Sequence, residues 1–289
     1  MANRPLASSV SSAEIAAALQ RLGVRHGDVL VVHSSIKAIG WVEEGPAAVC
    51  RALLKAVGEQ GTLAVPTFTL KRSNEPPPII DPATDPCEVG LINATFLQLP
   101  GIQRTIAWHH SFAVIGAAQE ELCAIAPEIS PLGDKGIFAK LLDLDARILL
   151  MGVAYSHCTA GHFAEYLCHI PHRRLVALPA WLRQPDGSLV EKHFDMYVPR
   201  TDVPYPPRDF NRAGDLLEQN GKVAITTLGN AYLRLFRLHD WIDLILTHYR
   251  NGDNLLTYAK GQTAGTLLRD GYTIEETTPV HTVRSVVKA

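Results

Sequence analysis

Short apolar runs alternate with an amphipathic segment in the first third of the chain. Residues 28–33 (DVLVVH) and 61–69 (GTLAVPTFT) are apolar runs of strand length, which is typical of buried strands. Between them, residues 46–57 place apolar side chains at helical spacing, and Pro46 takes a favoured first helical position. The order strand, helix, strand predicts a βαβ unit, which we expect to be parallel and right-handed.

The same pattern predicts elements over the rest of the chain. Ser11 and Glu14 are spaced as a capping box for a helix that Gly23 can end. Pro185-Asp186-Gly187 lies between two apolar segments and predicts a β-hairpin. Residues 278–289 alternate weakly, which fits either an edge strand or a disordered tail. Further helices are expected over residues 92–97, 117–123, 137–142, 210–219 and 239–249, and further strands up to residue 116 and over residues 147–153 and 222–228.

Residues 71–90 form a long, proline-rich segment between two predicted elements. Segments of this kind are often lids or binding loops, although a passive surface excursion fits the composition equally well. No internal repeat and no clear linker divides the sequence. We therefore expect a single α/β domain over residues 1–289.

Charge and cysteine usage exclude several classes of function. The formal net charge is −2 at pH 7, so no basic field indicates a nucleic acid or an anionic membrane as a partner. The five cysteines are irregularly spaced without a CxxC pair, which argues against a zinc ribbon and against a disulfide framework. The first residues lack the apolar core of a secretory signal, and no apolar run approaches the length of a membrane span. We expect a cytoplasmic protein.

The stretch Thr159–Arg174 (TAGHFAEYLCHIPHRR) is the strongest candidate for chemistry. With Thr159 as N-cap, a helix from residue 160 places His162 in its first turn and Glu165 on the same face. The positive pole of the helix disfavours a charged ring, while the carboxylate fixes the tautomer of the ring and stabilises imidazolium once it forms. This arrangement suits a general base, although a polar pair on a wet surface has the same spacing.

Two further groups of polar residues adjoin predicted strands. The segment His33-Ser34-Ser35 ends the first strand close to Lys37 and to a helix start. These groups suit a phosphate or a pantetheine chain, or else the serines only satisfy loop backbone. His109-His110-Ser111 precedes another strand, and paired histidines in such a position are more often structural than ligands.

Thiol and metal chemistry are alternatives at the same stretch. Cys158 lies four residues before His162, so a thiolate nucleophile is one interpretation, but cysteine is more often a small packed residue. His162, Glu165 and His169 follow a helical stripe, yet their spacing is not that of a zinc hydrolase, and we expect no metal.

Taken together, these stretches resemble the aminoglycoside 3-N-acetyltransferase family, the antibiotic acetyltransferases that use acetyl-coenzyme A. The similar blocks keep the order and spacing of the family over residues 29–166. They read VVHSSIKAIGWVEEGPAAV, GTLAVPTFT, IIDPATDPCEVGLINATF, LPGIQRT with HSFAVIG, and ILLMGVAYSHCTAGHFAEY. A weaker similarity follows further along the chain, in GKVAITTLGNAYLRLFRLHDWID. The resemblance implies a single three-layer α/β/α-type domain with a central mixed sheet. It also implies acetyl-CoA as cosubstrate, a small-molecule amine as acceptor and antibiotic resistance as the outcome. As the charge indicates, we expect no nucleic acid and no membrane as partner, and a homodimer stays open.

The resemblance also implies a role for individual residues. His162 takes the part of the catalytic base and Glu165 that of its orienting partner, with Thr159 in the same motif. The coenzyme-facing residues it implies are His33, Ser34, Ser35, Lys37, Thr67 and Ser111, and the acceptor-facing residues are Asp81 and His110. The sequence departs from the family at Ala94 and Leu97, where glutamate and arginine are usual, and at Ala107 and Trp108, where a His-Pro pair is usual.

Three other functions stay open on the sequence alone. Acyl transfer to a different amine would use the same coenzyme-facing residues. A hydrolase would work through Cys158 or a histidine-bound metal. A non-catalytic relative would bind coenzyme A without turnover.

Overall fold

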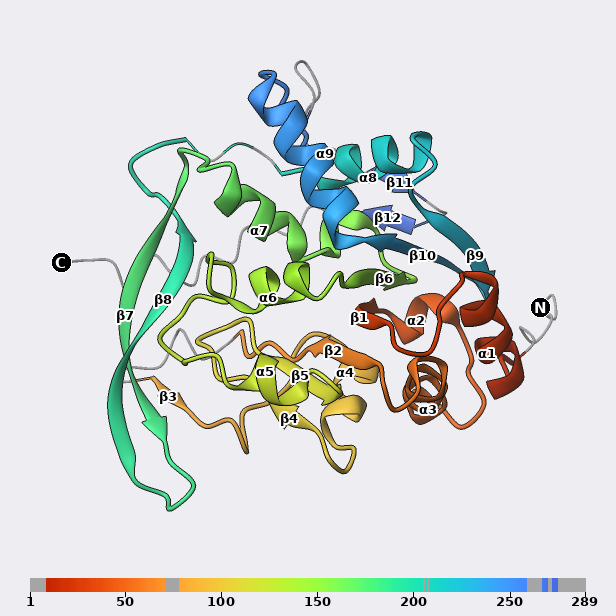
Figure 1. The fold of residues 1–289 in the computed structure, drawn as a ribbon, viewed down its shortest axis with the longest axis horizontal. Helices are drawn as coiled ribbons and strands as arrows, with labels where there is room; N and C mark the ends of the chain where they lie inside the picture. Colours follow the sequence, from red (N-terminus) through yellow and green to blue (C-terminus); the bar gives the residue numbers. More distant parts are fainter. Residues whose placement is uncertain are drawn as a thin grey trace, which may run out of the picture.

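A mixed sheet of seven strands lies at the centre of the computed structural model (Figure 1). The structure describes residues 9–70, 78–204, 206, 208–258, 267–269 and 272–274. In their order across the sheet, the strands are β4 (Gln103–Arg104), β5 (Phe112–Gly116), β2 (Thr62–Pro66), β1 (Val29–Ser34), β6 (Arg147–Met151), β10 (Ala231–Arg237) and β9 (Ala224–Leu228).

The three central strands of this sheet are parallel. β1 pairs with β2 on one side and with β6 on the other, and both pairings are parallel. The outer strands β4, β5, β9 and β10 run antiparallel to their neighbours. The predicted unit of β1, α3 (Pro46–Val57) and β2 is confirmed as parallel. Because β1, β2 and β6 point the same way, the segments that follow them emerge at one edge of the sheet.

Helices cover both faces of the sheet. Side chains alternate along β1, so that Leu30 and Val32 enter one apolar cluster and Val31 enters another. The first cluster includes side chains of α1 (Ser12–Arg21), α3 and α4 (Leu91–Leu97). The second includes side chains of α5 (Gln119–Cys123), α6 (Ile137–Asp143), α7 (Ala160–Leu167), α8 (Phe210–Gln219) and α9 (Leu238–Arg250). The expected α/β fold with a central mixed sheet between helices is confirmed.

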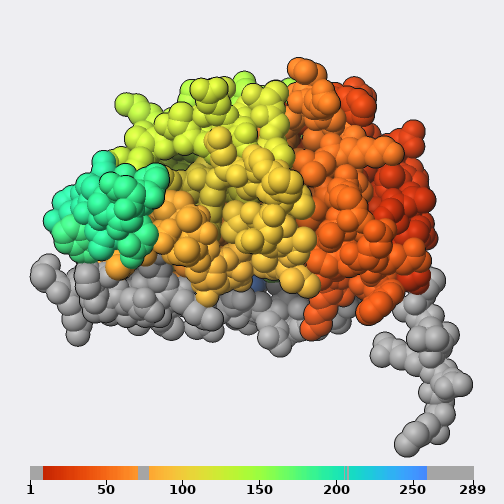
Figure 2. All heavy atoms as spheres, turned by 90° about the horizontal axis from the view of Figure 1, so that it is seen from below, coloured from red at the N-terminus to blue at the C-terminus, as the bar shows by residue number. Residues whose placement is uncertain are grey.

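A long hairpin stands beside the main sheet. β7 (Arg173–Arg183) and β8 (Leu189–Pro199) pair antiparallel around the predicted turn, and β3 (Ile79–Ile80) pairs with β7 in parallel. In Figure 2 the turquoise end of the hairpin lies beside the orange part of the chain, in agreement with the pairing of Ile79 and Trp181. The described part of the proline-rich segment is therefore attached to the hairpin.

The hydrophobic pattern predicts most of these elements but misses several, among them β3 and β4. Ser11 and Glu14 form the predicted capping box of α1. The short α2 (Ile36–Ile39) and the strand β10 are absent from the sequence-based prediction. The predicted tail element over residues 278–289 lies outside the described residues, and β11 (Leu267–Arg269) and β12 (Tyr272–Ile274) form a separate antiparallel pair. None of the described helices combines the length and the apolar content needed to cross a bilayer.

Candidate functional site

Three loops meet at the carboxyl edge of the parallel strands. The backbone N–H of Ser35, just after β1, donates to the carbonyl of Met151 at the end of β6, with N and O 2.9 Å apart. The backbone N–H of Thr67, just after β2, donates to the carbonyl of Ser111 over 2.8 Å. The chain after β6 passes through a 3-10 turn (Tyr155–His157) and enters α7. The predicted site segments are therefore brought together by the sheet.

His162 and Glu165 form a close pair on the first turn of α7. The His162 Nδ1 and the Glu165 Oε2 are 2.6 Å apart, and the side chains are 17% and 1% exposed. A carboxylate at this distance from Nδ1 favours a proton on Nδ1 and leaves the lone pair of the neutral ring on Nε2. The predicted placement of this pair is confirmed, and a pair with this geometry can act as an oriented base.

Thr159 does not cap α7, so this prediction is wrong. Its backbone has φ −60° and ψ −23°, and its side chain makes no capping hydrogen bond. A capping side chain needs an extended backbone at the N-cap, whereas here the chain reaches Thr159 from the 3-10 turn already in a helical conformation. The Thr159 side chain is buried, and its carbonyl accepts a hydrogen bond from the backbone N–H of His162.

Two residues of the β7–β8 hairpin contact Glu165. Arg173 Nη1 on β7 lies 3.5 Å from the Glu165 Oε2, and the Tyr197 hydroxyl on β8 donates to the Glu165 carbonyl over 3.1 Å. Arg173 Nη2 in turn donates to the Tyr197 carbonyl over 2.6 Å. Burial alone would raise the pKa of Glu165, but His162, Arg173 and Arg208 together bring it below its ordinary value. Glu165 is therefore held as a carboxylate.

Arg208 contacts the other nitrogen of the imidazole. Its Nη1 lies 2.8 Å from the His162 Nε2, and the ring also packs edge-on against Phe210 with centroids 5.2 Å apart. Burial lowers the pKa of His162 to about 4, Arg173 and Arg208 act in the same direction, and Glu165 opposes them. Arg208 is absent from the predicted site, because nothing in the local pattern connects it to His162, 46 residues away in the sequence.

His110 lies just before β5 and contacts the segment that follows β2. Its ring packs edge-on against Phe68 with centroids 4.8 Å apart. Burial lowers the pKa of His110, and the nearby His109, His162 and Arg173 lower it further, which places His110 within electrostatic reach of the base. The predicted residue His110 is therefore close enough to His162 for a charge on one ring to act on the other.

Thr67 and Ser111 form a small polar cluster with Arg104. Their hydroxyl oxygens are 3.3 Å apart, and the Ser111 hydroxyl also donates to the Thr67 carbonyl over 2.9 Å. Arg104 Nε donates to the Ser111 hydroxyl over 3.2 Å, and its Nη2 donates to the Thr67 carbonyl. Arg104 is absent from the predicted site, although this residue lies within the family-like block LPGIQRT.

The serines after β1 have structural partners. The Ser34 hydroxyl donates to the Asn93 Oδ1 over 3.0 Å, and the Ser35 hydroxyl accepts from the backbone N–H of Ala38 as the N-cap of α2. His33 is buried, and burial together with the nearby His157 lowers its pKa to about 3. Its Nε2 has no hydrogen-bond partner among the described residues. Lys37 lies exposed on α2.

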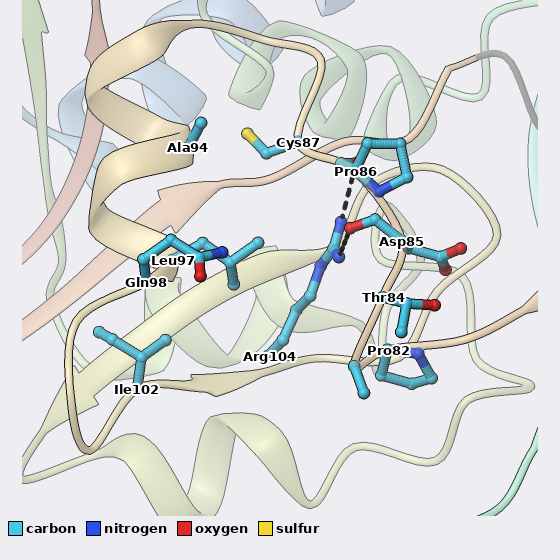
Figure 3. Close-up of a pocket in the computed structure, with 11 residues that line it drawn as sticks. Pro82, Thr84, Asp85, Pro86, Cys87, Ala94, Leu97, Gln98, Ile102 and Arg104 are labelled. Atoms are coloured by element: carbon cyan, nitrogen blue, oxygen red, sulfur yellow. Dashed lines mark hydrogen bonds between the residues drawn. The ribbon is translucent and has the colours of Figure 1, made fainter. Parts of the chain in front are cut away.

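Arg104 also lines a pocket of about 510 Å³ (Figure 3). Its wall combines the turn over residues 82–87 with Ala94 and Leu97 of α4. Figure 3 shows Arg104 reaching from β4 to the backbone of this turn, where it donates to the carbonyls of Asp85 and Pro86.

Asp81 does not line this pocket. Its carboxylate pairs with Arg183 of the hairpin over 3.1 Å, and its backbone N–H donates to the Asp85 Oδ2. The predicted acceptor-facing residue Asp81 therefore fixes the turn against the hairpin in this structure.

The thiol alternative loses support from the geometry. Cys158 is fully buried, and burial raises the pKa of its thiol to about 12, so the side chain is a thiol at neutral pH. All five cysteines are free. In the part of the chain that the structure describes, no group of three or more His, Cys, Asp or Glu side chains is arranged to hold a metal ion.

Comparison with known proteins gives a consistent picture. A family model described as aminoglycoside 3-N-acetyltransferase matches residues 31–249. Aminoglycoside N(3)-acetyltransferase IV of Salmonella sp is 34% identical over 230 residues, covering 79% of this chain and 83% of that protein.

Solved structures share the fold. A variant of aminoglycoside acetyltransferase AAC(3)-IVa in complex with a gentamicin matches with a TM-score of 0.69 and 27% identity, covering 86% of this chain and 91% of that one. AAC-IIIb bound to CoASH matches with a TM-score of 0.75 over 86% of this chain and 98% of that one, and its 21% identity shows the fold alone.

Proposed function

This chain belongs to the aminoglycoside 3-N-acetyltransferase family, and from that premise we propose that it transfers an acetyl group from acetyl-CoA to an amine of an aminoglycoside, at the 3-amino position of the deoxystreptamine ring, and so confers resistance. The observation that carries the proposal is the neutral His162, held by Glu165 at the carboxyl edge of the sheet. We further place the enzyme in the cytoplasm, as a single domain over residues 1–289.

The end of β1 fits acetyl-CoA. The buried Nε2 of His33, for which the described part of the chain offers no partner, can accept a hydrogen bond from an amide N–H of a pantetheine arm. The exposed ammonium of Lys37 suits the coenzyme phosphates. Ser34, Ser35, Thr67 and Ser111 shape this edge through their internal hydrogen bonds. Acetyl-CoA supplies the acetyl group as a thioester and departs as the free thiol.

His162 acts as general base on the acceptor. As the amine nitrogen bonds to the acyl carbon, its proton passes to Nε2, and the same proton then returns to the departing sulfur. Glu165 stabilises the imidazolium that exists between these two transfers, because its carboxylate lies on Nδ1. General base catalysis contributes about 10²–10⁴-fold, and positioning of the two substrates supplies much of the rest. Thr159 stays a candidate for the oxyanion donor, and His110 for an acceptor contact.

Substitution of the base tests this proposal. His162→Ala is expected to keep its affinity for acetyl-CoA and to lose at least about a hundredfold in kcat with an aminoglycoside acceptor, as measured by release of free thiol. His193→Ala, an exposed histidine on β8, is the matched control and should keep full activity. Full turnover by His162→Ala would remove the base assignment.

A second acceptor class has one observation in its favour. Ala94 and Leu97, where the family usually carries glutamate and arginine, line the pocket beside Arg104. An acceptor with fewer cationic groups would suit this wall better than a polycation would. A screen of kanamycin-type and gentamicin-type aminoglycosides against small monoamines distinguishes the two, since only the preferred class gives the higher kcat/KM.

A further inference from the structure

The lone pair of the proposed base is already occupied. Nδ1 of His162 faces Glu165, so Nε2 is the nitrogen that takes the proton of the acceptor. Arg208 Nη1 lies 2.8 Å from this Nε2, at hydrogen-bond distance. A guanidinium N–H that donates to Nε2 occupies the position that an amine N–H has to reach.

The charges around the ring make this contact incompatible with proton transfer. Among the described residues, the charged and titratable groups that face His162 are Glu165 on its own helix, Arg173 from β7, Arg208 from the connection before α8, and His110 from the loop before β5. A proton on Nε2 would point at a guanidinium that has only donors to offer. A second cation, the acceptor ammonium, would also be repelled from the same position.

The backbone around Arg208 is anchored, so its guanidinium would leave Nε2 through rotation of the side chain. Its backbone is held by an isolated bridge to Thr257, and the next residue, Asp209, donates from its N–H to the Leu256 carbonyl over 3.0 Å. The guanidinium carbon lies 6.0 Å from the Phe210 ring centre, so the side chain passes over an apolar surface. A long side chain on a fixed backbone fits a movable cap.

We propose that Arg208 is a positioning residue that caps the His162 Nε2 between turnovers and is displaced by the acceptor amine. This proposal rests on the function proposed above and adds a specificity device to it. When the acceptor binds, its amine N–H replaces the Arg208 N–H as the donor to Nε2. Between turnovers, Arg208 keeps Nε2 from being protonated by solvent. An acceptor that fails to displace Arg208 binds nearby without reacting.

Kinetics of Arg208→Met provide the first test, because methionine keeps much of the apolar stem over Phe210 and removes the donors. We expect KM for the acceptor to fall and kcat/KM to rise by on the order of tenfold, since a hydrogen bond from a charged donor no longer has to be broken. The Kd of acetyl-CoA should stay the same. Arg208→Lys, with a charge but a single-point donor, should lie between the wild type and Arg208→Met.

A control and an opposing outcome define this test. Arg200→Met removes an arginine from the same connection that pairs with Asp202, and it should leave all acceptor constants unchanged. A loss of kcat/KM in folded Arg208→Met would overturn the proposal, because Arg208 would then assist the reaction. Unchanged acceptor constants would overturn it equally.

The second readout needs no turnover and so separates this proposal from the proposed function. Titration of His162 followed by ¹⁵N–¹H NMR of its imidazole should show a higher pKa in Arg208→Met than in the wild type, since the variant removes a cation from Nε2. An identical titration curve in the two proteins would remove the cap, whatever the enzyme acetylates. Activity of His162→Ala would instead remove the base and leave the cap measurable.

Discussion

The His162 imidazole stands between neighbours that act on its proton affinity in opposite directions. Glu165 on Nδ1 favours a protonated ring, whereas burial, Arg173 and Arg208 favour the neutral ring and prevail. The ring is therefore ready to accept a proton at neutral pH but is a weak base until its surroundings change. Displacement of Arg208 by the acceptor would supply that change at the moment of reaction.

Glu165→Gln tests the role of the Glu165 carboxylate at the His162 Nδ1. We expect kcat to fall more than KM changes, because the amide keeps a hydrogen bond to Nδ1 but no longer stabilises imidazolium. The free energy of unfolding should also drop by about 3–5 kcal/mol, since the buried Arg173 loses its carboxylate. Urea unfolding and steady-state kinetics measure the two effects. Glu121→Gln, which breaks an exposed pair with Lys140, should change the unfolding free energy by less than about 1 kcal/mol.

The buried histidines also set how stability depends on pH. The pKa is lowered to about 4 for His162 and to about 3 for His33, both from an ordinary value of 6.5. Below pH 6.5 the unfolded chain binds protons that the folded chain does not, so the free energy of unfolding falls as the pH decreases toward these values.

At about pH 5 each of these two histidines should destabilise the fold by about 2 kcal/mol relative to about pH 7. Urea unfolding at both pH values measures the loss. His162→Gln should lose less stability over this interval than the wild type does. An equal loss in both proteins would show that His162 titrates normally in the folded state.

At the scale of elements, α7 owes its position to close packing at a glycine. A Cβ atom at Gly161 would come within 2.4 Å of the Phe210 ring, and this ring is the one that packs edge-on against His162. The 3-10 turn before α7 is fixed by Tyr155, whose hydroxyl donates to Glu218, while Arg234 pairs with the same carboxylate. The helix start is thus held by α8 and β10 rather than by a capping side chain.

Gly161→Ala should therefore damage both stability and activity. We expect a loss of about 1–3 kcal/mol in the free energy of unfolding, because the methyl group displaces Phe210. The kcat should fall with it, since the imidazole loses its packing surface. Thermal unfolding and kinetics check this result. At Gly133 a new Cβ meets its nearest neighbour at an ordinary 3.4 Å, so Gly133→Ala is the control and should be close to neutral.

The elements show what the sequence pattern can and cannot predict. Apolar runs and turn residues were sufficient for β1, β2, β6 and the β7–β8 hairpin, because burial and turn chemistry are local signals. β10 was missed because Arg234 interrupts its apolar run and is read as a surface residue. In the structure Arg234 is buried and paired with Glu218, so a tertiary ion pair overrides the local pattern.

At the scale of the whole molecule, some residues of the site could be predicted from local sequence, whereas others are brought to it only by tertiary structure. The pair of His162 and Glu165 could be predicted because both residues lie on one helical turn. Arg173, Tyr197 and Arg208 reach this pair only through the fold, and no spacing in the sequence indicates them. The family resemblance supplied the coenzyme-facing residues, and their assignment stays a prediction.

Ligand binding provides a test at this scale. Coenzyme A should raise the midpoint of thermal unfolding in a concentration-dependent manner, by an amount equivalent to about 2.7 kcal/mol at a hundredfold excess over Kd. Lys37→Ala should reduce this shift if the lysine contacts the phosphates. Lys55→Ala, an exposed lysine on α3, should preserve it. A shift of equal size in Lys37→Ala would remove Lys37 from the coenzyme site.

The pairing of β1 with β6 has a consequence for how the protein acquires its activity. This pairing places Leu30 opposite Arg147. A large part of the chain must therefore be synthesised before the central strands can form their hydrogen bonds. Such distant pairings slow folding. The helix α7 lies beyond β6 in the chain, after the 3-10 turn. On the ribosome, the first strand and helices would therefore be synthesised well before His162 and Glu165 can pair, and refolding should restore secondary structure sooner than turnover.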